Sequence, residues 1–175
     1  MQAQLIFMAA PHRQCDVGDK AQVEAVMQAV AGRFGSVNVL VSNAGIHRRV
    51  DPLNFSEEDV DAIFRVNMKG TLNVVGAAAR IMTESQTAGA IVLISALGGG
   101  LVGLGRAGSA YGMSKGGITA LARDLAAEFA GRIRVNAVAP GWVRTPMTSA
   151  LQVSLPHLCP PHPYKSHRFP LPLTG

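Results

Sequence analysis

Three short apolar runs rich in β-branched residues alternate with segments of helical pattern, and this alternation limits the folds that the chain can adopt. The runs are VNVLVS at 37–42, AIVLIS at 90–95 and IRVNAVA at 133–139. A strand–helix–strand–helix–strand order is typical of a parallel sheet with right-handed crossover connections. The first two runs have the continuous apolar character of strands that are buried on both faces. The sequence therefore predicts an α/β fold with about three contiguous strands flanked by helices.

Helical signals lie before and between these runs. Asp19 is a candidate N-cap for a helix that continues to about Arg33 with an apolar stripe on one side. Ser56 followed by Asp59 resembles a capping box that opens a helix to about Val66. Two longer helices are predicted at 69–83 and 109–130.

Composition and charge narrow the class of protein. The chain has 175 residues, 48% of them hydrophobic and 15% charged, which is typical of a globular domain and not of a disordered chain. Residues 1–128 contain eleven Lys/Arg and eleven Asp/Glu, so the net charge of +5 arises wholly in residues 129–175. These cations form no basic stripe with interleaved aromatic residues, so nucleic-acid binding is not expected. No apolar run approaches the roughly 20 residues of a membrane span and no signal peptide is recognised, so we expect a cytoplasmic protein.

A change of composition marks the end of the predicted domain, near Ala150. Six of the ten prolines and three of the five histidines lie in residues 154–175. Prolines at this density oppose helices and strands, so residues 151–175 are expected to form a disordered proline-rich tail. The same prolines oppose a helix that would gather His157, His162 and His167, so no metal site is predicted.

Ligands of parallel α/β sheets bind beyond the carboxyl ends of the strands. The segments to examine are therefore Ser42–Gly45, Ser95–Gly100 and Pro140–Thr145. Gly103, Gly105 and Gly108 also match G-x-G-x-x-G, the form of a dinucleotide fingerprint. That fingerprint places its first glycine at a strand-to-helix turn, whereas Gly103 lies eight residues beyond Ser95. We therefore interpret the segment that contains these three glycines as a loop over the site and not as a dinucleotide fingerprint.

Tyr111 and Lys115 are four residues apart on a predicted helix, so their side chains share one face. A nearby ammonium lowers the pKa of a tyrosine from about 10 and makes the phenol a useful acid–base group near neutral pH. Taken alone, such a pair is also typical of a solvated helix face. Ser95, Asn43–Gly45 and Pro140–Gly141, all at strand ends, favour the catalytic interpretation.

Six segments in this order resemble the short-chain dehydrogenase/reductase family. They are CDVGD (15–19), SNAG (42–45), RVNMKG (65–70), VLISALGG (92–99), YGMSK (111–115) and IRVNAVAPGWVRTPM (133–147). The resemblance covers about residues 14–150 and implies an incomplete Rossmann-like, doubly wound parallel sheet. It also implies that the protein interconverts an alcohol and a carbonyl, while NAD or NADP accepts or supplies the hydride. The substrate would be a small alcohol or ketone, and members of the family form homo-oligomers.

The resemblance implies roles for individual residues. Tyr111 would be the general acid–base, and Lys115 would lower its pKa and bind the nicotinamide ribose. Ser95 would hold the substrate oxygen and Asn67 a water of the proton relay. Asp16 and Val17 would contact the adenine ring, and the other cofactor-binding residues would be Asn43, Ala44, Gly45, Pro140, Gly141, Val143 and Thr145. An alternative is that Asn43 and Asn67 only satisfy backbone groups and that Val143 only packs.

Parts of the family pattern are not found in this sequence. The T-G-x-x-x-G-x-G turn, which cradles a pyrophosphate at a helix N-terminus, does not precede Asp16, and neither does the residue that selects NAD or NADP. We therefore expect residues 1–14 to be atypical, residues 15–150 to be a partial domain, and this truncated chain to be inactive. A strand at about 12–17 would have lost both sheet partners. The alternative function is a non-catalytic subunit that joins full-length copies through the family's dimer helices.

Arg48 and Arg49 follow the SNAG motif, in a segment similar to that of relatives acting on sugar acids such as gluconates. Either guanidinium could bind a substrate carboxylate, and both could instead be ordinary surface cations. A sugar acid is therefore one candidate substrate.

Overall fold

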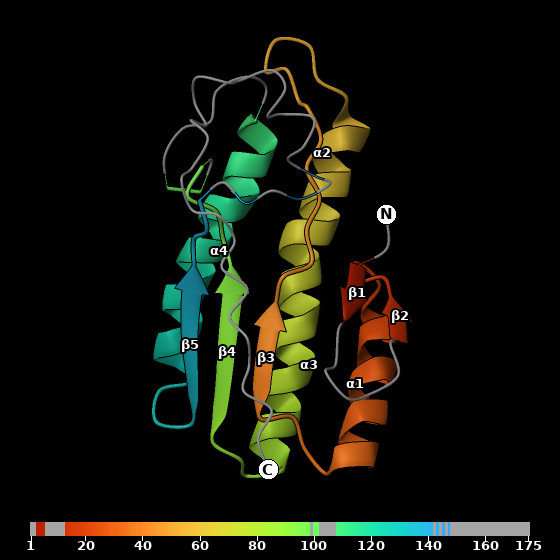
Figure 1. Ribbon diagram of the computed structural model, residues 1–175, viewed down its shortest axis with the longest axis vertical. Helices are drawn as coiled ribbons and strands as arrows, with labels where there is room; N and C mark the ends of the chain where they lie inside the picture. Colours follow the sequence, from red (N-terminus) through yellow and green to blue (C-terminus); the bar gives the residue numbers. More distant parts are fainter. Residues whose placement is uncertain are drawn as a thin grey trace, which may run out of the picture. The chain divides into compact units, whose positions relative to one another are not determined.

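A parallel sheet of three strands forms the centre of the fold. In the computed structural model, which describes residues 3–5, 13–98, 100–101, 108–141, 143, 145 and 147, these strands are β3 (Val39–Ser42), β4 (Gly89–Ile94) and β5 (Ile133–Val138). They lie in the order β3-β4-β5, and all the pairings are parallel (Figure 1). This confirms the predicted α/β sheet of three contiguous strands.

One face of this sheet forms the core. Alternate residues of the strands, Leu40, Ile91, Leu93, Ile133 and Val135, are buried. Helices α3 (Gly70–Glu84) and α4 (Ser109–Glu128) lie on the same side of the sheet (Figure 1) and pack against it. Burial of these strand side chains against the two helices is the main contribution that stabilises the sheet, and it fixes the positions of the carboxyl ends of the strands.

The prediction that the first apolar run is buried on both faces is wrong. Val39 and Val41 point away from the core and are 64% and 52% exposed. Arg134 and Asn136 of β5 are exposed as well. The described residues thus leave this face of the sheet uncovered, and an apolar sequence run does not reveal whether a helix covers it.

Helix α1 (Lys20–Phe34) has the predicted N-cap. The Asp19 carboxylate accepts hydrogen bonds from the N–H groups of Ala21 and Gln22, at 3.0 and 3.2 Å. Such bonds satisfy donors that the first turn of a helix leaves open. The helix ends at Gly35, whose φ of 84° suits a glycine. Its buried residues Val23 and Met27 belong to the main core, and the helix packs against α3.

The predicted helices at 56–66 and 69–83 are continuous in the structure. Helix α2 (Glu57–Ile63) runs into a π-helical turn, η1 (Phe64–Lys69), which runs into α3. The expected capping box is wrong, because Ser56 makes no side-chain capping bond. The Asp59 carboxylate instead pairs with Arg48, at 2.6 Å. π-helical turns are often found at functional sites.

A short antiparallel pair precedes α1. β1 (Ala3–Leu5) pairs with β2 (Arg13–Cys15), in the register Ala3↔Cys15. β2 lies outside the three-stranded sheet, which agrees with the expectation that a strand near 12–17 has lost both of the family's sheet partners. Its pairing with β1 was not expected.

The chain divides into two compact units, Met1–Gly141 and Trp142–Gly175. The predicted proline-rich tail with its three histidines lies outside the described residues. Gly103 and Gly105 of the G-x-G-x-x-G motif lie outside them as well. Gly108 of that motif is described, and it is the residue directly before α4. Among the helices of the described residues, none has both the length and the apolar character that a membrane crossing requires.

Candidate active site

The first compact unit brings the predicted catalytic segments to the carboxyl edge of the sheet. Asn43–Gly45 directly follow β3, and Ser95 directly follows β4. Tyr111 and Lys115 lie in the first two turns of α4, and Asn67 lies in η1. This is the edge at which ligands of parallel α/β sheets bind.

Lys115 is almost wholly buried, with 4% of its surface exposed. Its Nζ donates a hydrogen bond of 2.7 Å to the carbonyl oxygen of Ile94, at the end of β4. Burial lowers the pKa of Lys115 to about 8, because an ammonium is poorly solvated in the interior. The amine therefore changes charge in a pH range close to neutral.

Tyr111 is half-buried, and burial raises the pKa of its phenol above the ordinary value of 10. The expected lowering of this pKa by Lys115 is thus not found. The cause of the raised pKa is burial of the phenol, while the lysine Nζ lies 5.9 Å from the ring centroid and donates its hydrogen bond to Ile94. The phenol is consequently protonated at neutral pH.

His47 is a neighbour of Tyr111 that is not among the predicted site residues. Its ring makes an edge-to-face contact with the tyrosine ring, with 5.1 Å between centroids. Burial lowers the pKa of His47, which favours the neutral imidazole. The signal available in the sequence was its place, two residues after Gly45 in the loop that follows β3.

Ser95 is buried, and its hydroxyl has partners within the protein. Oγ donates to the carbonyl oxygen of Lys115 at 2.8 Å and lies 2.7 Å from Oγ1 of Thr119. Gly100 lies against the same hydroxyl, since a Cβ added there would come within 2.8 Å of Ser95 Oγ. Gly100 is the last residue of the predicted segment Ser95–Gly100, whereas Thr119 was not predicted, because no spacing rule links it to Ser95.

Asn67 is fully buried and joins the loop after β3 to α4. Its Oδ1 accepts from the Ile46 N–H at 2.8 Å, and its Nδ2 donates to the Ile46 carbonyl at 3.0 Å and to Ser114 Oγ at 2.9 Å. This side chain therefore satisfies backbone groups, as one of the two interpretations of Asn67 expects. It also holds the loop that carries Gly45 and His47.

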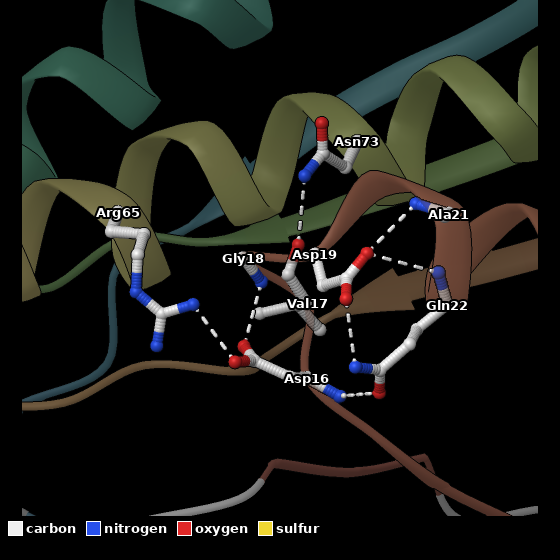
Figure 2. A network of polar contacts seen from close by, with 8 residues as sticks. All are labelled: Asp16, Val17, Gly18, Asp19, Ala21, Gln22, Arg65 and Asn73. Carbon is white, nitrogen blue, oxygen red and sulfur yellow. Dashed lines mark hydrogen bonds and ion pairs between the residues drawn. The ribbon is translucent and has the colours of Figure 1, made fainter.

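A second group of predicted residues forms the turn between β2 and α1, shown in Figure 2. The Asp16 carboxylate accepts from the Gly18 N–H at 2.9 Å and from Arg65 Nη1 at 2.8 Å. The Arg65 hydrogen bond is the main reason that the pKa of Asp16 is lowered. Asn73 Nδ2 donates to the Val17 carbonyl at 2.9 Å. Side chains from η1 and α3 thus fix this turn.

The remaining predicted residues differ in their surroundings. Gly45 lies against Asn67 and Lys115, since a Cβ added there would lie 3.4 Å from Asn67 Oδ1 and 3.5 Å from Lys115 Nζ. The Pro140 carbonyl accepts from the Leu97 N–H at 2.9 Å. Asn43 and Gly141 are exposed and Ala44 is partly buried. Val143 and Thr145 are exposed and belong to the second compact unit.

Replacing Lys115 by Met should stabilise the chain near neutral pH. A buried ammonium with a lowered pKa costs stability below that pKa, because the unfolded chain binds the proton more tightly. The gap between 10.5 and about 8 corresponds to roughly 3 kcal/mol at most, and loss of the bond to Ile94 leaves a net gain of about 1–2 kcal/mol. As the pH rises from about 8 towards 10.5, the parent chain should gain stability and the difference should narrow. Urea unfolding at about pH 7 and about pH 9.5 measures this.

Lys69→Met is the matched control, because Lys69 is exposed. This variant should show no such dependence on pH relative to the parent chain. Equal unfolding free energies for the parent chain and Lys115→Met at both pH values would contradict the prediction.

Comparison with known proteins identifies the family. The family model described as Enoyl-(Acyl carrier protein) reductase matches residues 3–157. The 3-oxoacyl-(acyl-carrier-protein) reductase FabG of Thermotoga maritima is 41% identical over 137 residues, which are 78% of this chain and 54% of that protein. Oxidoreductase UcpA of Salmonella typhimurium is 39% identical over 139 residues, 79% of this chain and 52% of that protein.

Solved structures agree with these relatives. Ligand-free aldohexose dehydrogenase of Thermoplasma acidophilum matches with a TM-score of 0.74 and 30% identity, over 82% of this chain and 55% of that one. Gluconate 5-dehydrogenase of Burkholderia cenocepacia, in complex with NADP and tartrate, matches with a TM-score of 0.72 and 34% identity, over 78% and 52%. The chain spans about half the length of the curated relatives it matches. It belongs to the short-chain dehydrogenase/reductase family of NAD(P)-dependent oxidoreductases.

Proposed function

We propose that the domain to which residues 15–150 contribute interconverts an alcohol and a carbonyl by hydride transfer with NAD or NADP. The observation that carries this proposal is the grouping of Ser95, Tyr111 and Lys115 at the carboxyl end of β4. Family membership supports the reaction class, and two solved relatives with NADP bound support the cofactor class.

The residues present fit a nicotinamide cofactor at two places. Gly45 has no side chain and so leaves room beside Lys115 Nζ and Asn67. The turn at Asp16–Gly18 presents a carboxylate at the carboxyl end of β2. When bound, the nicotinamide supplies or accepts the hydride. Pro140 and Gly141 follow β5, and we propose that they line the nicotinamide end. For Val143 and Thr145, cofactor binding is proposed on the family resemblance alone.

Tyr111 is the proposed proton donor to the carbonyl oxygen. Its raised pKa keeps the phenol protonated at neutral pH, which is the form that reduction requires. Lys115 would turn from the Ile94 carbonyl towards the cofactor ribose and the phenol, where its charge would stabilise the phenolate left after proton transfer. Ser95 would exchange its bond with Thr119 for one to the substrate oxygen. Asn67 positions the loop of Gly45 and His47, and we propose that it also orders a water in the proton relay.

The proposed substrate is a small alcohol or ketone, with a sugar acid as the specific candidate. The gluconate 5-dehydrogenase and aldohexose dehydrogenase relatives support this choice. Arg48 is paired with Asp59, so Arg49, which is exposed, is the better partner for a substrate carboxylate.

The 175-residue polypeptide by itself is proposed to be inactive. Its sequence contains the catalytic residues but no glycine-rich turn of the family pattern ahead of Asp16. Tests of catalysis therefore use a chimera, in which residues 13–147 of this chain replace the matching part of the Thermotoga maritima relative.

The chimera should consume NADPH or NADH with ketones or aldehydes in a spectrophotometric assay. Arg49→Ala should raise KM for an acidic polyol such as gluconate in the reverse reaction about tenfold, and should change KM for a neutral polyol much less. Arg48→Ala is the matched control, because its guanidinium is already paired with Asp59. Absence of turnover with every compound of the panel would contradict the proposed function, and equal effects on both polyols would remove the carboxylate site.

A further inference from the structure

Arg65 takes part in an arrangement that the proposed catalytic residues do not explain. It extends from η1 to the turn between β2 and α1 and pairs with the Asp16 carboxylate at 2.8 Å (Figure 2). Its guanidinium lies directly over Gly18, where a Cβ would overlap it. A glycine at position 18 is therefore needed for this ion pair to form as it does.

Hydrogen bonds and close packing hold the residues of this turn in position. The Asp16 N–H donates to Gln22 Oε1 at 3.2 Å, and the Gln22 amide donates in turn to Asp19 at 2.8 Å. The Val17 carbonyl accepts from Asn73, and the Val17 side chain packs so closely on Gly70 that a Cβ there would lie 2.6 Å from Val17 Cγ2. Such a turn is ordered before any ligand binds, which lowers the entropic cost of binding.

The Asp16 carboxylate has capacity left for a ligand. Each of its oxygens accepts one protein hydrogen bond, from Gly18 or from Arg65, and a carboxylate oxygen can accept two. The side chains of Arg65 and Asp16 are 50% and 34% exposed, so both are accessible from solvent. An exposed ion pair of this kind contributes little to the free energy of unfolding by itself. Its main effect is to orient the Asp16 carboxylate and to keep it ionised.

We propose that Arg65 is a positioning residue for the adenine half of the cofactor. Its ion pair holds the Asp16 carboxylate where it accepts the exocyclic amino group of adenine, so the turn prefers adenine to hypoxanthine, whose oxo group is an acceptor at that position. This inference rests on the proposed function, because it takes Asp16 and Val17 as the adenine site. The planar guanidinium also offers a surface on which a purine can stack.

The test is a ligand titration of the 175-residue chain followed by ¹H–¹⁵N NMR. AMP and IMP are added up to roughly 20 mM, which detects dissociation constants in the millimolar range. The amide signals of Asp16–Gly18 should shift with AMP and much less with IMP. Arg65→Gln should reduce the initial slope of the AMP shifts about three- to tenfold, and Arg65→Lys should restore part of it. Nicotinamide mononucleotide, which lacks adenine, should not distinguish these variants.

Arg80→Gln is the matched control, because Arg80 is a similarly exposed arginine that pairs with Glu24 at 3.7 Å, away from the turn. Gly18→Ala is a second route to the same loss, since it displaces the guanidinium without changing a charge. Its effect and that of Arg65→Gln should not add in the double variant. The carboxyl carbon signal of Asp16 should show a higher pKa in Arg65→Gln than in the parent chain.

The outcomes separate this inference from the proposed function. If AMP shifts no amide of Asp16–Gly18, or if Asp16→Ala leaves the shifts unchanged, the adenine site and with it the proposed cofactor placement are wrong. If Asp16→Ala abolishes the shifts while Arg65→Gln behaves like Arg80→Gln, only the role of Arg65 is overturned. Equal slopes for AMP and IMP would overturn the contact of Asp16 with the exocyclic amino group, and with it this inference, but not the placement of adenine at the turn.

Discussion

Replacing Tyr111 by Phe in the chimera should lower kcat for ketone reduction about a thousandfold and leave KM for NADPH nearly unchanged. Removal of one hydroxyl preserves the ring that packs against His47 and removes the proposed proton donor. General acid catalysis contributes roughly 10²- to 10⁴-fold, and its loss belongs to the transition state and not to cofactor binding. Initial rates at saturating and at varied NADPH measure both quantities.

Ser109→Ala is the matched control for this variant, because it removes a hydroxyl at an exposed position of the same helix. It should retain the parent kcat within about twofold. A Tyr111→Phe variant that keeps more than about a tenth of the parent kcat would show that another group donates the proton. His47 would then be the first candidate, since it contacts the same ring.

The 175-residue polypeptide should bind NADPH about a thousandfold more weakly than the chimera and show no turnover. The family pattern places a glycine-rich turn at a helix N-terminus around the pyrophosphate, and this sequence has no such turn before Asp16. Loss of an anion site built from backbone amides and a helix dipole costs several kcal/mol, and each 1.4 kcal/mol is tenfold in affinity. Hydride transfer also needs the nicotinamide held at about 3.5 Å from the substrate carbon, which remote binding contacts make possible.

Fluorescence titration with NADPH up to about 1 mM, followed by turnover assays with alcohols and ketones, measures this difference. The chimera is the control for the competence of Ser95, Tyr111 and Lys115. A micromolar dissociation constant for the 175-residue polypeptide, or turnover that Tyr111→Phe abolishes, would contradict the prediction. Such a result would mean that residues 1–14 replace the turn.

The strands were predictable because their signal is local. The runs at 37–42, 90–95 and 133–139 each match a strand whose two ends lie within two residues of the predicted bounds. The exposure of Val39 and Val41 was not predictable, because a β-branched run looks the same whether or not a helix covers it. Likewise, the pairing of β1 with β2 depends on a contact between segments that share no recognisable pattern.

For the site, the sequence predicted which segments meet but not how their side chains are bonded. The carboxyl ends of parallel strands must share one edge, so Asn43–Gly45 and Ser95 were expected near Tyr111. The bond of Lys115 to Ile94 and the contact of Ser95 with Thr119 depend on rotamers and burial, which spacing does not encode. The raised pKa of Tyr111 follows from the same burial.

The π-helical turn η1 has a consequence for how the two halves of the candidate site are held in register. A π-turn adds one residue to the helical path, and each added residue rotates everything beyond it by about 100°. Asn67, within the turn, bonds to Ile46 in the loop after β3, whereas Asn73, beyond it, bonds to the Val17 carbonyl in the turn after β2. Deleting Lys69, the exposed last residue of η1, would be expected to restore an ordinary helix and leave the hydrophobic core composition intact. It would turn one asparagine away from its partner, so η1 sets the angle between the helix face that holds the loop after β3 and the helix face that holds the turn after β2.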